Sequence, residues 1–458
     1  MLQAYQSLAY SDFSDPERAA GYRRALEQVG AQLGTHAPLV IGGKEVSTDG
    51  TIRSVDPSRP LRLVGTAASA TDEHAARAMA AAWEAFPDWS RTPAEKRAAM
   101  VHRVGDLIEG RIYEFAAWQT YEAGKNWVEA EADVAEAIDF CHYYAQQAIA
   151  MDQPLPVHEY PGESNRSWLQ PIGAGVVIPP WNFPLAILVG MTMGPVAAGN
   201  TVVLKPASNT PLVGWGFMRI LEEAGMPPGV VNFLPGPGAR VGDRLVDDPT
   251  TRFINFTGSK EVGLRIAERS AQVHEGQRWM KRAYMEMGGK DAMIVDETAD
   301  LEAAAADVVR SAFGFQGQKC SACSRLIIVD EVHDELVARV IERTDALDIG
   351  PPTENHAVGP VISKEQFESI LEEINRGRQE ATLVAGGSTV SRDGGYYIQP
   401  TIFTDVRPKA RLAQHEIFGP VQVIIPFDTE EEAVAIANGT DYGLVAGVWT
   451  RDGGRQMR

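Results

Sequence analysis

A cysteine in a turn is the first residue of this sequence that could act as a nucleophile. Cys320 lies in FGFQGQKCSACS, between a helical pattern and the strand-like SRLIIVD. A thiol in a turn rich in Gly and Gln can be exposed, and its thiolate can attack a carbonyl carbon. A buried cysteine that acts as a small hydrophobic residue is the common alternative. The turn by itself leaves both roles open.

The spacing of Cys320 and Cys323 also fits a redox pair or half of a metal site. Tetrahedral zinc needs four Cys or His ligands at recognisable spacing. Neither a second CxxC nor an HxxxH follows this pair. A thioredoxin-like role fits poorly in a loop so late in a large α/β chain. We therefore predict no metal site.

A carboxylate and an amide precede this cysteine in the chain. Glu286, in YMEMGGKDAMIVD, ends a predicted short strand beside Gly288 and Gly289, where something can approach the backbone closely. It is either a base facing a cleft or a solvated strand end. Asn182, in GVVIPPWNFPLAI, lies between a strand and a helix predicted from Pro184. Taken alone, this position favours a helix cap over an oxyanion donor.

Three further segments suit a nucleotide. They are TVVLKPAS, with Lys205 at a strand end, PGPGARVG, with Gly236 and Gly238, and FTGSKEVG, with Gly258 and Ser259. The N-terminus of a helix favours phosphate. None of the three is the GxGxxG fingerprint, so each is also consistent with an ordinary turn between strand and helix.

Alternating strands and helices must position these residues. Strand patterns at 175–178, 201–205, 230–234 and 253–258 alternate with helices from Pro184, over 212–224 and from Ala239. A second block has strands at 291–296 and 325–330 and helices at 300–313 and 331–347. Alternation of this kind indicates parallel sheets covered by helices, so we predict two α/β domains.

The N-terminal third is predicted to be mainly helical. Asp15 and Pro16 form a start signal for a helix within the polar segment 1–35. Residues 72–150 have a helical pattern that breaks near Thr92 and Pro93 and at Gly124. Pro154 to Gly162 ends this pattern, and 165–173 (NRSWLQPIG) is predicted as a hairpin strand.

Composition excludes several classes of partner. The chain has 458 residues, 61 acidic against 42 basic side chains and a formal charge of -19, without a long Lys/Arg cluster, which argues against nucleic acid and anionic membranes. The uncharged stretch 167–204 is divided by prolines into segments too short to span a bilayer. Three cysteines and an N-terminus without a signal-peptide pattern predict a cytoplasmic protein.

Taken together, six segments resemble the aldehyde dehydrogenase superfamily. They are PPWNFP, KPAS, FTGS, EMGGKD, FGFQGQKCSA and EIFGP, and the separation of 34 positions from Glu286 to Cys320 is similar to the family's spacing of general base and nucleophile. The resemblance runs from about residue 40 to the last residue. It is strongest to the branch of 1-pyrroline-5-carboxylate (L-glutamate γ-semialdehyde) dehydrogenases, through GKNWVEAEADVAEAIDF, RFINFTGSKEVG and KRAYMEMGGKDAMIVDETAD.

The resemblance implies a fold and a domain division. We expect two Rossmann-like parallel-sheet domains with a small β arm for oligomerisation. The division expected is an N-terminal helical segment at 1–40, a cofactor-binding domain at 41–285 with the arm near 152–171, and a catalytic domain at 286–458. A homo-oligomer is expected for the complete protein.

The resemblance also implies roles for individual residues. Cys320 would attack the aldehyde, Asn182 would stabilise the oxyanion, and Glu286 would activate water to hydrolyse the thioester. NAD would be bound by Ile178, Pro179, Trp181, Lys205, Ser208, Gly238, Gly258, Ser259, Glu416 and Phe418. The substrate, expected to be L-glutamate γ-semialdehyde, would be bound by Glu136, Phe183 and Ser321.

The sequence departs from the family pattern at two places. Ser208 in KPAS replaces a glutamate that accepts from the adenosine ribose, so NADP use is possible beside NAD. Family members continue past GVWTRD, whereas this chain stops at Arg458, which predicts an incomplete catalytic domain. The alternatives are an inactive fragment, a non-catalytic protein that keeps the fold, and a cofactor-independent cysteine hydrolase with His415 or His274 as its base.

Overall fold

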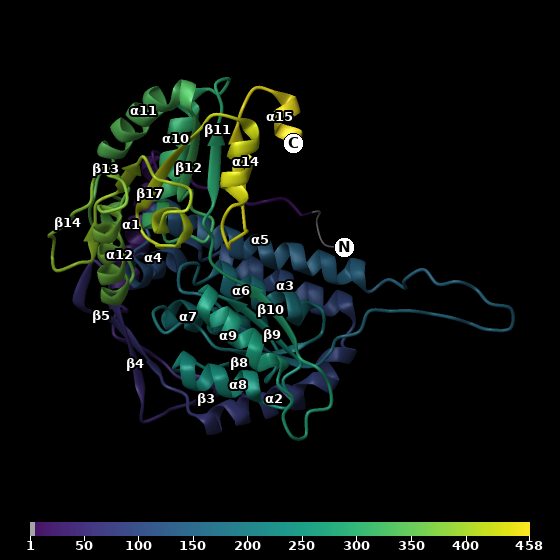
Figure 1. Ribbon diagram of the computed structural model, residues 1–458. Helices are drawn as coiled ribbons and strands as arrows, with labels where there is room; N and C mark the ends of the chain where they lie inside the picture. The colour runs from purple at the N-terminus through teal and green to yellow at the C-terminus, as the bar shows by residue number, and fades with distance from the viewer. Residues whose placement is uncertain (1–4) are drawn as a thin grey trace. The chain divides into compact units, whose positions relative to one another are not determined.

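The computed structural model describes residues 5–458, and the chain divides into two compact units (Figure 1). Unit 1 consists of Met1–Val55, Arg62–Ala123 and Ala130–Glu286. Unit 2 consists of Asp56–Leu61, Gly124–Glu129 and Met287–Arg458. The first four residues of the predicted N-terminal segment lie outside the described residues.

The helices of the N-terminal third form where their end signals lie. Helix α1 begins after Asp15, whose side chain accepts a hydrogen bond from the Glu17 N–H at 2.9 Å. Residues 72–151 form four helices, because Gly110 and Arg111 add a break to those predicted at Pro93 and Gly124. The five helices are α1 (Pro16–Gly30), α2 (Asp72–Arg91), α3 (Ala94–Glu109), α4 (Ile112–Ala123) and α5 (Trp127–Met151).

The main sheet of unit 1 has seven strands in the order β10-β9-β6-β7-β8-β2-β3. The first five of these run parallel, whereas β2 is antiparallel to both β8 and β3. Their bounds are β2 (Leu39–Ile41), β3 (Lys44–Val46), β6 (Ala174–Ile178), β7 (Thr201–Leu204), β8 (Val231–Phe233), β9 (Phe253–Thr257) and β10 (Arg282–Glu286). The chain passes from β6 through β7 to β8 on one side and returns to β9 on the other, so the strand order reverses between β6 and β9.

Helices between these strands follow the predicted alternation with two differences. They are α6 (Ala186–Ala197), α7 (Pro211–Ala224), η1 (Gly238–Gly242), α8 (Asp243–Asp247) and α9 (Lys260–Ala271). Helix α6 begins two residues later than the predicted start at Pro184, and the turn that follows Gly238 is a π-helix rather than an α-helix. A separate sheet has the order β1-β5-β4, formed by Thr35–Ala37, Arg59–Ala68 and Thr51–Asp56.

Unit 2 contains a six-stranded sheet in the order β13-β16-β17-β12-β11-β18. Only β13, at one edge, runs antiparallel to its neighbour. The strands are β11 (Ala292–Val295), β12 (Arg325–Val329), β13 (Thr382–Ala385), β16 (Thr401–Thr404), β17 (Val421–Phe427) and β18 (Ala446–Trp449); β14 (Thr389–Val390) and β15 (Tyr397–Ile398) form a separate pair.

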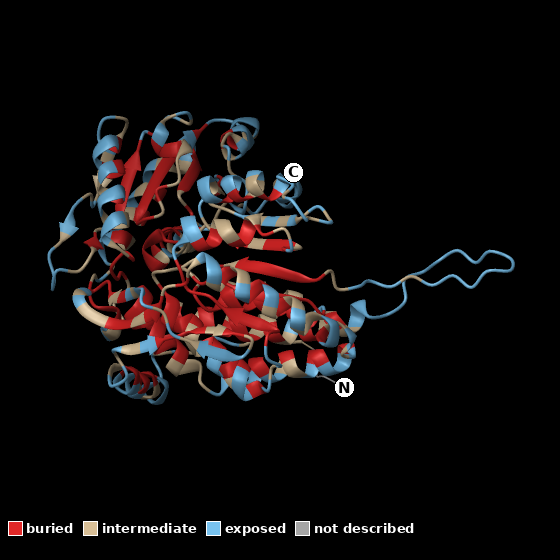
Figure 2. Cartoon of the chain, turned by 90° about the horizontal axis from the view of Figure 1, so that it is seen from below, coloured by how far each residue is buried: buried red, intermediate tan, exposed pale blue. Residues whose placement is uncertain are grey.

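Helices cover both faces of this sheet, as the apolar run in β12 requires. Ile327 and Val329 pack with α12 (Lys364–Gly377), α13 (Arg411–Gln414) and α14 (Glu430–Asn438). Leu326 and Ile328 pack with α10 (Leu301–Phe313) and α11 (His333–Asp345) on the other face. Buried strands are drawn in red in Figure 2, and β7 and β12 are buried along their whole length. The remaining elements are η2 (Gly314–Gly317), η3 (Asp330–Val332), η4 (Pro352–Glu354) and α15 (Gly453–Met457).

The hairpin strand predicted at 165–173 is not formed. Residues 152–171 extend away from unit 1 as an exposed loop (Figures 1 and 2), with one bridge in which the Leu155 N–H donates to the Ser167 carbonyl at 2.8 Å. Two chain segments without a third strand or a packed face are marginal as a sheet. Residues 152–171 therefore protrude in the region where the arm is predicted, but they do not form the predicted strand.

Among residues 5–458, no helix combines the length and the apolar character that crossing a membrane requires. The uncharged stretch 167–204 instead contains the buried strand β6, the helix α6 and the buried strand β7.

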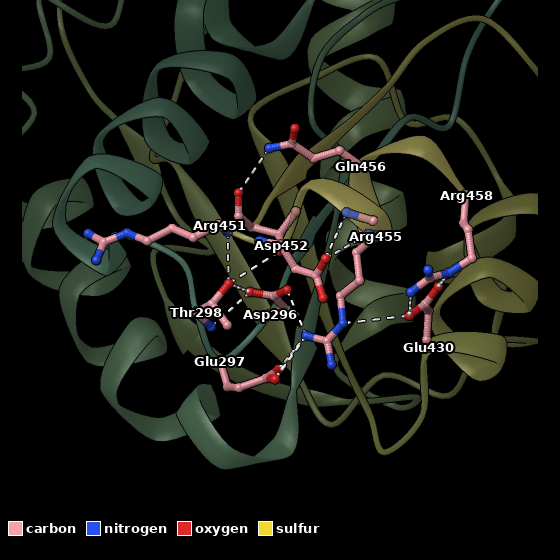
Figure 3. Close-up of polar contacts among 11 residues, drawn as sticks. Asp296, Glu297, Thr298, Glu430, Arg451, Asp452, Arg455, Gln456 and Arg458 are labelled. Atoms are coloured by element: carbon pink, nitrogen blue, oxygen red, sulfur yellow. Dashed lines mark hydrogen bonds and ion pairs between the residues drawn. The ribbon is translucent and has the colours of Figure 1, made fainter.

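Ion pairs of Arg455 hold the C-terminal residues to the rest of unit 2 (Figure 3). Its guanidinium contacts Asp296 at 2.8 Å, Glu297 at 2.9 Å and Glu430 at 3.5 Å, and Arg458 contacts Glu430 at 2.6 Å. Single exposed pairs contribute little to stability, but several charges that share one cation act as a network.

We expect the substitution Arg455→Ala to loosen β18 and α15 locally. Hydrogen exchange followed by mass spectrometry should show faster exchange over 446–458 and unchanged exchange in β12 and β17, because among the described strands β18 pairs with β11 alone. Arg451→Ala is the control, since Arg451 makes one long pair, 3.8 Å, with Asp300. Equal exchange in the two variants would contradict a role for the network.

Candidate active site

Cys320 lies in a turn whose backbone is held in an unusual conformation. Phe315, Gln316 and Gly317 have φ of 47°, 56° and 65°, in the left-handed region. Non-glycine residues persist there only when the surroundings fix them. A Cβ at Gly317 would lie 2.3 Å from the Gly419 carbonyl oxygen. The chain therefore reverses sharply between α10 and β12, and Cys320 follows this reversal.

Two buried glutamines hold the turn in place. The Gln316 side chain donates to the Pro360 carbonyl at 2.7 Å, and the Gln318 side chain accepts from the Ile362 N–H at 2.9 Å. Both glutamines are at most 2 % exposed. Because a buried amide without partners is costly, these bonds specify one arrangement of the turn. The glutamines of this Gly- and Gln-rich turn thus fix its conformation.

The two glycines after Glu286 allow two different groups to approach β11. A Cβ at Gly288 would lie 2.0 Å from Glu416 Oε2, and a Cβ at Gly289 would lie 2.2 Å from the Cys320 carbonyl oxygen. The sequence predicted a close approach here without identifying what approaches. The structure shows that the turn of Cys320 and the carboxylate of Glu416 are the two groups.

Glu416 and Phe418 lie in the segment before β17. Glu416 Oε1 accepts from the Gly289 N–H at 2.9 Å, and burial raises the pKa of this carboxyl. Phe418 has a φ of 55°. Both residues line a small cavity together with Gly289, Lys290 and Lys319. Strands β11, β12 and β17 are neighbours in the sheet of unit 2. The segments that precede them therefore meet at the amino edge of this sheet.

The Cys320 thiol is half-buried and lies near two carboxylates. Burial raises the pKa of this thiol most, and the charges of Asp291 and Glu416 raise it further. Hydrogen bonds from the Cys320 and Ser321 N–H groups lower it. Cys141, Cys320 and Cys323 are all free thiols, and Cys323 is buried, with its pKa raised to about 12.

Asp291 is a neighbour of Cys320 that the sequence did not single out. Its Oδ1 accepts from the Val445 N–H at 3.2 Å, while its buried Oδ2 has no hydrogen-bond partner in the described chain. Burial raises the pKa of Asp291 to about 6. The carboxylate is therefore charged above about pH 6 and neutral below it.

We expect Asp291→Asn to accelerate alkylation of Cys320 by iodoacetamide above pH 6. Removal of the negative charge lowers the thiol pKa, so the thiolate fraction at pH 7.5 should rise roughly three- to tenfold. Below about pH 6 the two rates should converge, because Asp291 is then neutral in the parent chain. Peptide mass spectrometry measures the rate at Cys320, and the exposed Asp345→Asn is the control. A slower or unchanged rate at pH 7.5 would contradict this electrostatic role.

The predicted nucleotide residues of unit 1 lie along one edge of its sheet. Pro179 follows β6, Lys205 follows β7, Gly238 comes shortly after β8, Gly258 follows β9 and Glu286 ends β10. These five strands are parallel neighbours, so their carboxyl ends share an edge. Ligands of open α/β sheets bind at this edge where the strand order reverses, here between β6 and β9.

Lys205 is the most buried charged group at this edge. Its side chain is 4 % exposed, its Nζ donates to the Pro206 carbonyl at 3.1 Å, and burial lowers its pKa to about 8. Ser208 is half-buried three residues later. At Gly238 no atom lies within 4 Å of a built Cβ, so packing within the chain does not require this glycine.

The turn after β6 contains the next group of predicted residues. Ile178, Trp181 and Phe183 are half-buried, and Asn182 is 4 % exposed. The local interpretation of Asn182 as a helix cap is wrong. Helix α6 has Leu185 at its N-cap without a side-chain hydrogen bond, and the Ala186 N–H donates to Asp133 Oδ1 at 2.6 Å.

A local sequence pattern could not identify Asp133 as the cap of α6, because Asp133 lies on α5, 53 residues before Ala186. The same helix carries Glu136, which is half-buried.

Of the other predicted residues, Ser259 caps α9 by accepting from the Val262 N–H at 3.4 Å, and Glu286 and Ser321 are exposed. Cys320, Ser321, Glu416 and Phe418 thus belong to unit 2, and the other predicted residues belong to unit 1.

The protein-family model for the aldehyde dehydrogenase family matches residues 45–458. The chain belongs to the aldehyde dehydrogenase family. A relative from Geobacillus kaustophilus, named 1-pyrroline-5-carboxylate dehydrogenase, is 50% identical over 453 residues, which cover 99% of this chain and 88% of that protein. A relative from Bacillus subtilis, named 1-pyrroline-5-carboxylate dehydrogenase 2, is 47% identical over 453 residues, which again cover 99% of this chain and 88% of that protein.

Solved structures of aldehyde dehydrogenases have the same fold. The structure of a 1-pyrroline-5-carboxylate dehydrogenase from Thermus with bound NAD has a TM-score of 0.99 and 49% identity, and the match covers 100% of this chain and 89% of that one. The two α/β units predicted from alternating strands and helices are therefore those of an aldehyde dehydrogenase.

Proposed function

We propose that this aldehyde dehydrogenase oxidises L-glutamate γ-semialdehyde to L-glutamate with NAD. The observation that carries the proposal is identity of about half of all residues, over nearly the whole chain, to relatives named 1-pyrroline-5-carboxylate dehydrogenase. The thiol of Cys320, in a turn fixed by buried glutamines, supplies the nucleophile that such an oxidation needs.

The carboxyl edge of the unit 1 sheet fits a dinucleotide. It combines a reversal of strand order, a buried lysine and open space at Gly238. We propose that NAD is held by Ile178, Pro179, Trp181, Lys205, Ser208, Gly238, Gly258, Ser259, Glu416 and Phe418. Bound NAD would supply the hydride acceptor that oxidation of the aldehyde carbon requires.

The residues of the chain divide the remaining chemistry. The Cys320 thiolate forms a bond to the aldehyde carbon, and the Asn182 amide and the Cys320 N–H donate to the resulting oxyanion. After oxidation the carbon is held as a thioester. Glu286 takes a proton from the water that attacks this thioester, the C–S bond breaks, and the carboxylate product leaves.

Glu136, Phe183 and Ser321 are the proposed substrate residues. Glu136 pairs with the substrate ammonium, while Phe183 and Ser321 line the path of the aldehyde. This assignment separates two substrates, because the five-carbon aldehyde acid without the amino group, 5-oxopentanoate, offers nothing for Glu136 to bind.

The test is NADH formation by the purified chain with each of these two aldehydes. We expect a higher kcat/KM for glutamate γ-semialdehyde, and Glu136→Gln should reduce that value while leaving 5-oxopentanoate nearly unchanged. Equal losses for both aldehydes would overturn the role of Glu136, and a higher kcat/KM for 5-oxopentanoate in the parent chain would overturn the substrate.

Parallel assays with NADP test the effect of Ser208 on cofactor choice, and we expect a higher kcat/KM with NAD than with NADP.

We also propose that the protein forms a homo-oligomer through residues 152–171. This segment exposes Leu155, Val157, Tyr160, Trp168 and Leu169, each at least 41% exposed, and an apolar strip of this kind marks an interaction surface. Light scattering of the chain with and without 154–169 tests the proposal, which fails if the mass per particle is unchanged.

A cytoplasmic location is proposed on the three free cysteines, which fit a reducing compartment. Fractionation of the source cells tests it, and recovery outside the cytoplasmic fraction would refute it.

A further inference from the structure

Three potential metal ligands meet on two helices of unit 1, apart from every residue proposed for the reaction. His102 and Asp106 lie one turn apart on α3, and His142 lies on α5. Asp106 Oδ1 is 3.2 Å from His102 Nδ1 and 3.1 Å from His142 Nε2. The three ligand atoms all lie within 4.8 Å of one another.

The packing of α3 against α5 brings these side chains together. A Cβ at Gly105 would lie 2.7 Å from His142 Nε2 and 3.0 Å from the Cys141 Cβ. Because glycine has no side chain, the His142 ring can lie against α3, where it stacks on the His102 ring at a centroid distance of 4.2 Å. Residues four apart on a helix share a face, so His102 and Asp106 both reach this ring.

The separations fit ligands of one metal ion. Atoms that bind a tetrahedral ion at about 2.0 to 2.1 Å lie about 3.3 Å from each other. Asp106 Oδ1 already lies at such distances from both imidazole nitrogens. The side chains of His102, His142 and Asp106 are 24%, 19% and 55% exposed, so an ion can enter from solvent and keep water at its remaining position.

We propose that His102, Asp106 and His142 bind a divalent transition-metal ion of the zinc type, which joins α3 to α5. Two imidazole nitrogens and one carboxylate are ligands for Zn²⁺, Co²⁺ and Ni²⁺, whereas Mg²⁺ and Ca²⁺ prefer oxygen ligands alone. The ion stabilises the fold, because it binds the folded arrangement of two helices that separate on unfolding.

Isothermal titration of Zn²⁺ into the tag-free Cys320→Ala chain tests this site. The alanine removes the one half-exposed thiol, which itself binds Zn²⁺, while Cys141 and Cys323 are buried. We expect one ion per chain and a higher Tm with Zn²⁺, and no effect of Mg²⁺. Absence of saturable Zn²⁺ binding overturns the proposal and leaves a hydrogen-bonded His–Asp–His cluster.

Variants in the same background locate the ion. Asp106→Asn and His102→Asn should weaken Zn²⁺ binding at least about tenfold and abolish the rise in Tm. His158→Ala, which removes an exposed histidine from segment 152–171, should change neither. Circular dichroism without metal shows whether each variant is folded, and a folded Asp106→Asn or His102→Asn chain that binds Zn²⁺ as tightly as its parent overturns the proposal.

Discussion

Cys320→Ala should reduce NADH formation from glutamate γ-semialdehyde by at least about 10⁴-fold, because removal of a nucleophile removes the covalent path and leaves only binding. The loss should fall on kcat. The overall fold should persist, since Cys320 is half-buried in a turn that the side chains of Gln316 and Gln318 hold. Steady-state rates measured beside a thermal unfolding curve separate the chemical loss from unfolding.

Cys323→Ala is the matched control for this prediction. Cys323 is 3% exposed, and its Sγ contacts the Arg325 carbonyl at 3.6 Å. Loss of this side chain should lower Tm but keep the rate within about tenfold of the parent, because it removes packing and no reacting group. If both variants are equally inactive while folded, the two cysteines act as a pair, which is the redox alternative.

Glu286→Gln should slow turnover by about 10²- to 10⁴-fold through the loss of a general base. Hydrolysis of the thioester should suffer most, since thiolate attack does not need this carboxylate in the proposed mechanism. Rapid mixing should then show a burst of about one NADH per active site followed by a slow phase. The thioester should accumulate on Cys320 and be trapped by hydroxylamine.

The exposed carboxylate of Glu275 provides the control for Glu286, and Glu275→Gln should leave both phases unchanged. A burst that disappears in Glu286→Gln, with a slow first turnover, would instead assign the carboxylate to the attack of the thiol. That result would revise the role of Glu286 without changing the nucleophile.

Several elements of the fold were predictable because their signals are local. Asp15 and Pro16 begin α1 where the sequence placed the start, since a cap bonds to a residue two positions away. The apolar runs of β7 and β12 are buried as predicted, because alternation of strands with helices covers both faces of a parallel sheet. The order of motifs likewise identified the family to which the chain belongs.

The sequence misjudged elements whose partners lie far along the chain. Asn182 was interpreted as a cap, but the side chain that caps α6 is Asp133 on α5. The strand predicted at 165–173 has strand-like residues, but within the described residues it makes one isolated bridge, between Leu155 and Ser167, and joins no sheet. A local pattern gives the preference of a segment, whereas its hydrogen-bond partners are set by packing.

The sequence by itself determined the thiol, the carboxylate and the lysine to which the roles of nucleophile, base and nucleotide ligand are proposed, because side-chain chemistry and motif spacing are properties of the chain. Only the tertiary structure decided what surrounds them. Asp291 and Glu416 near the thiol, the contacts that require Gly288 and Gly289, and the meeting of His102 with His142 all depend on segments brought together by folding. Distances between such segments follow from the packing of sheets and helices, which no short stretch of sequence specifies.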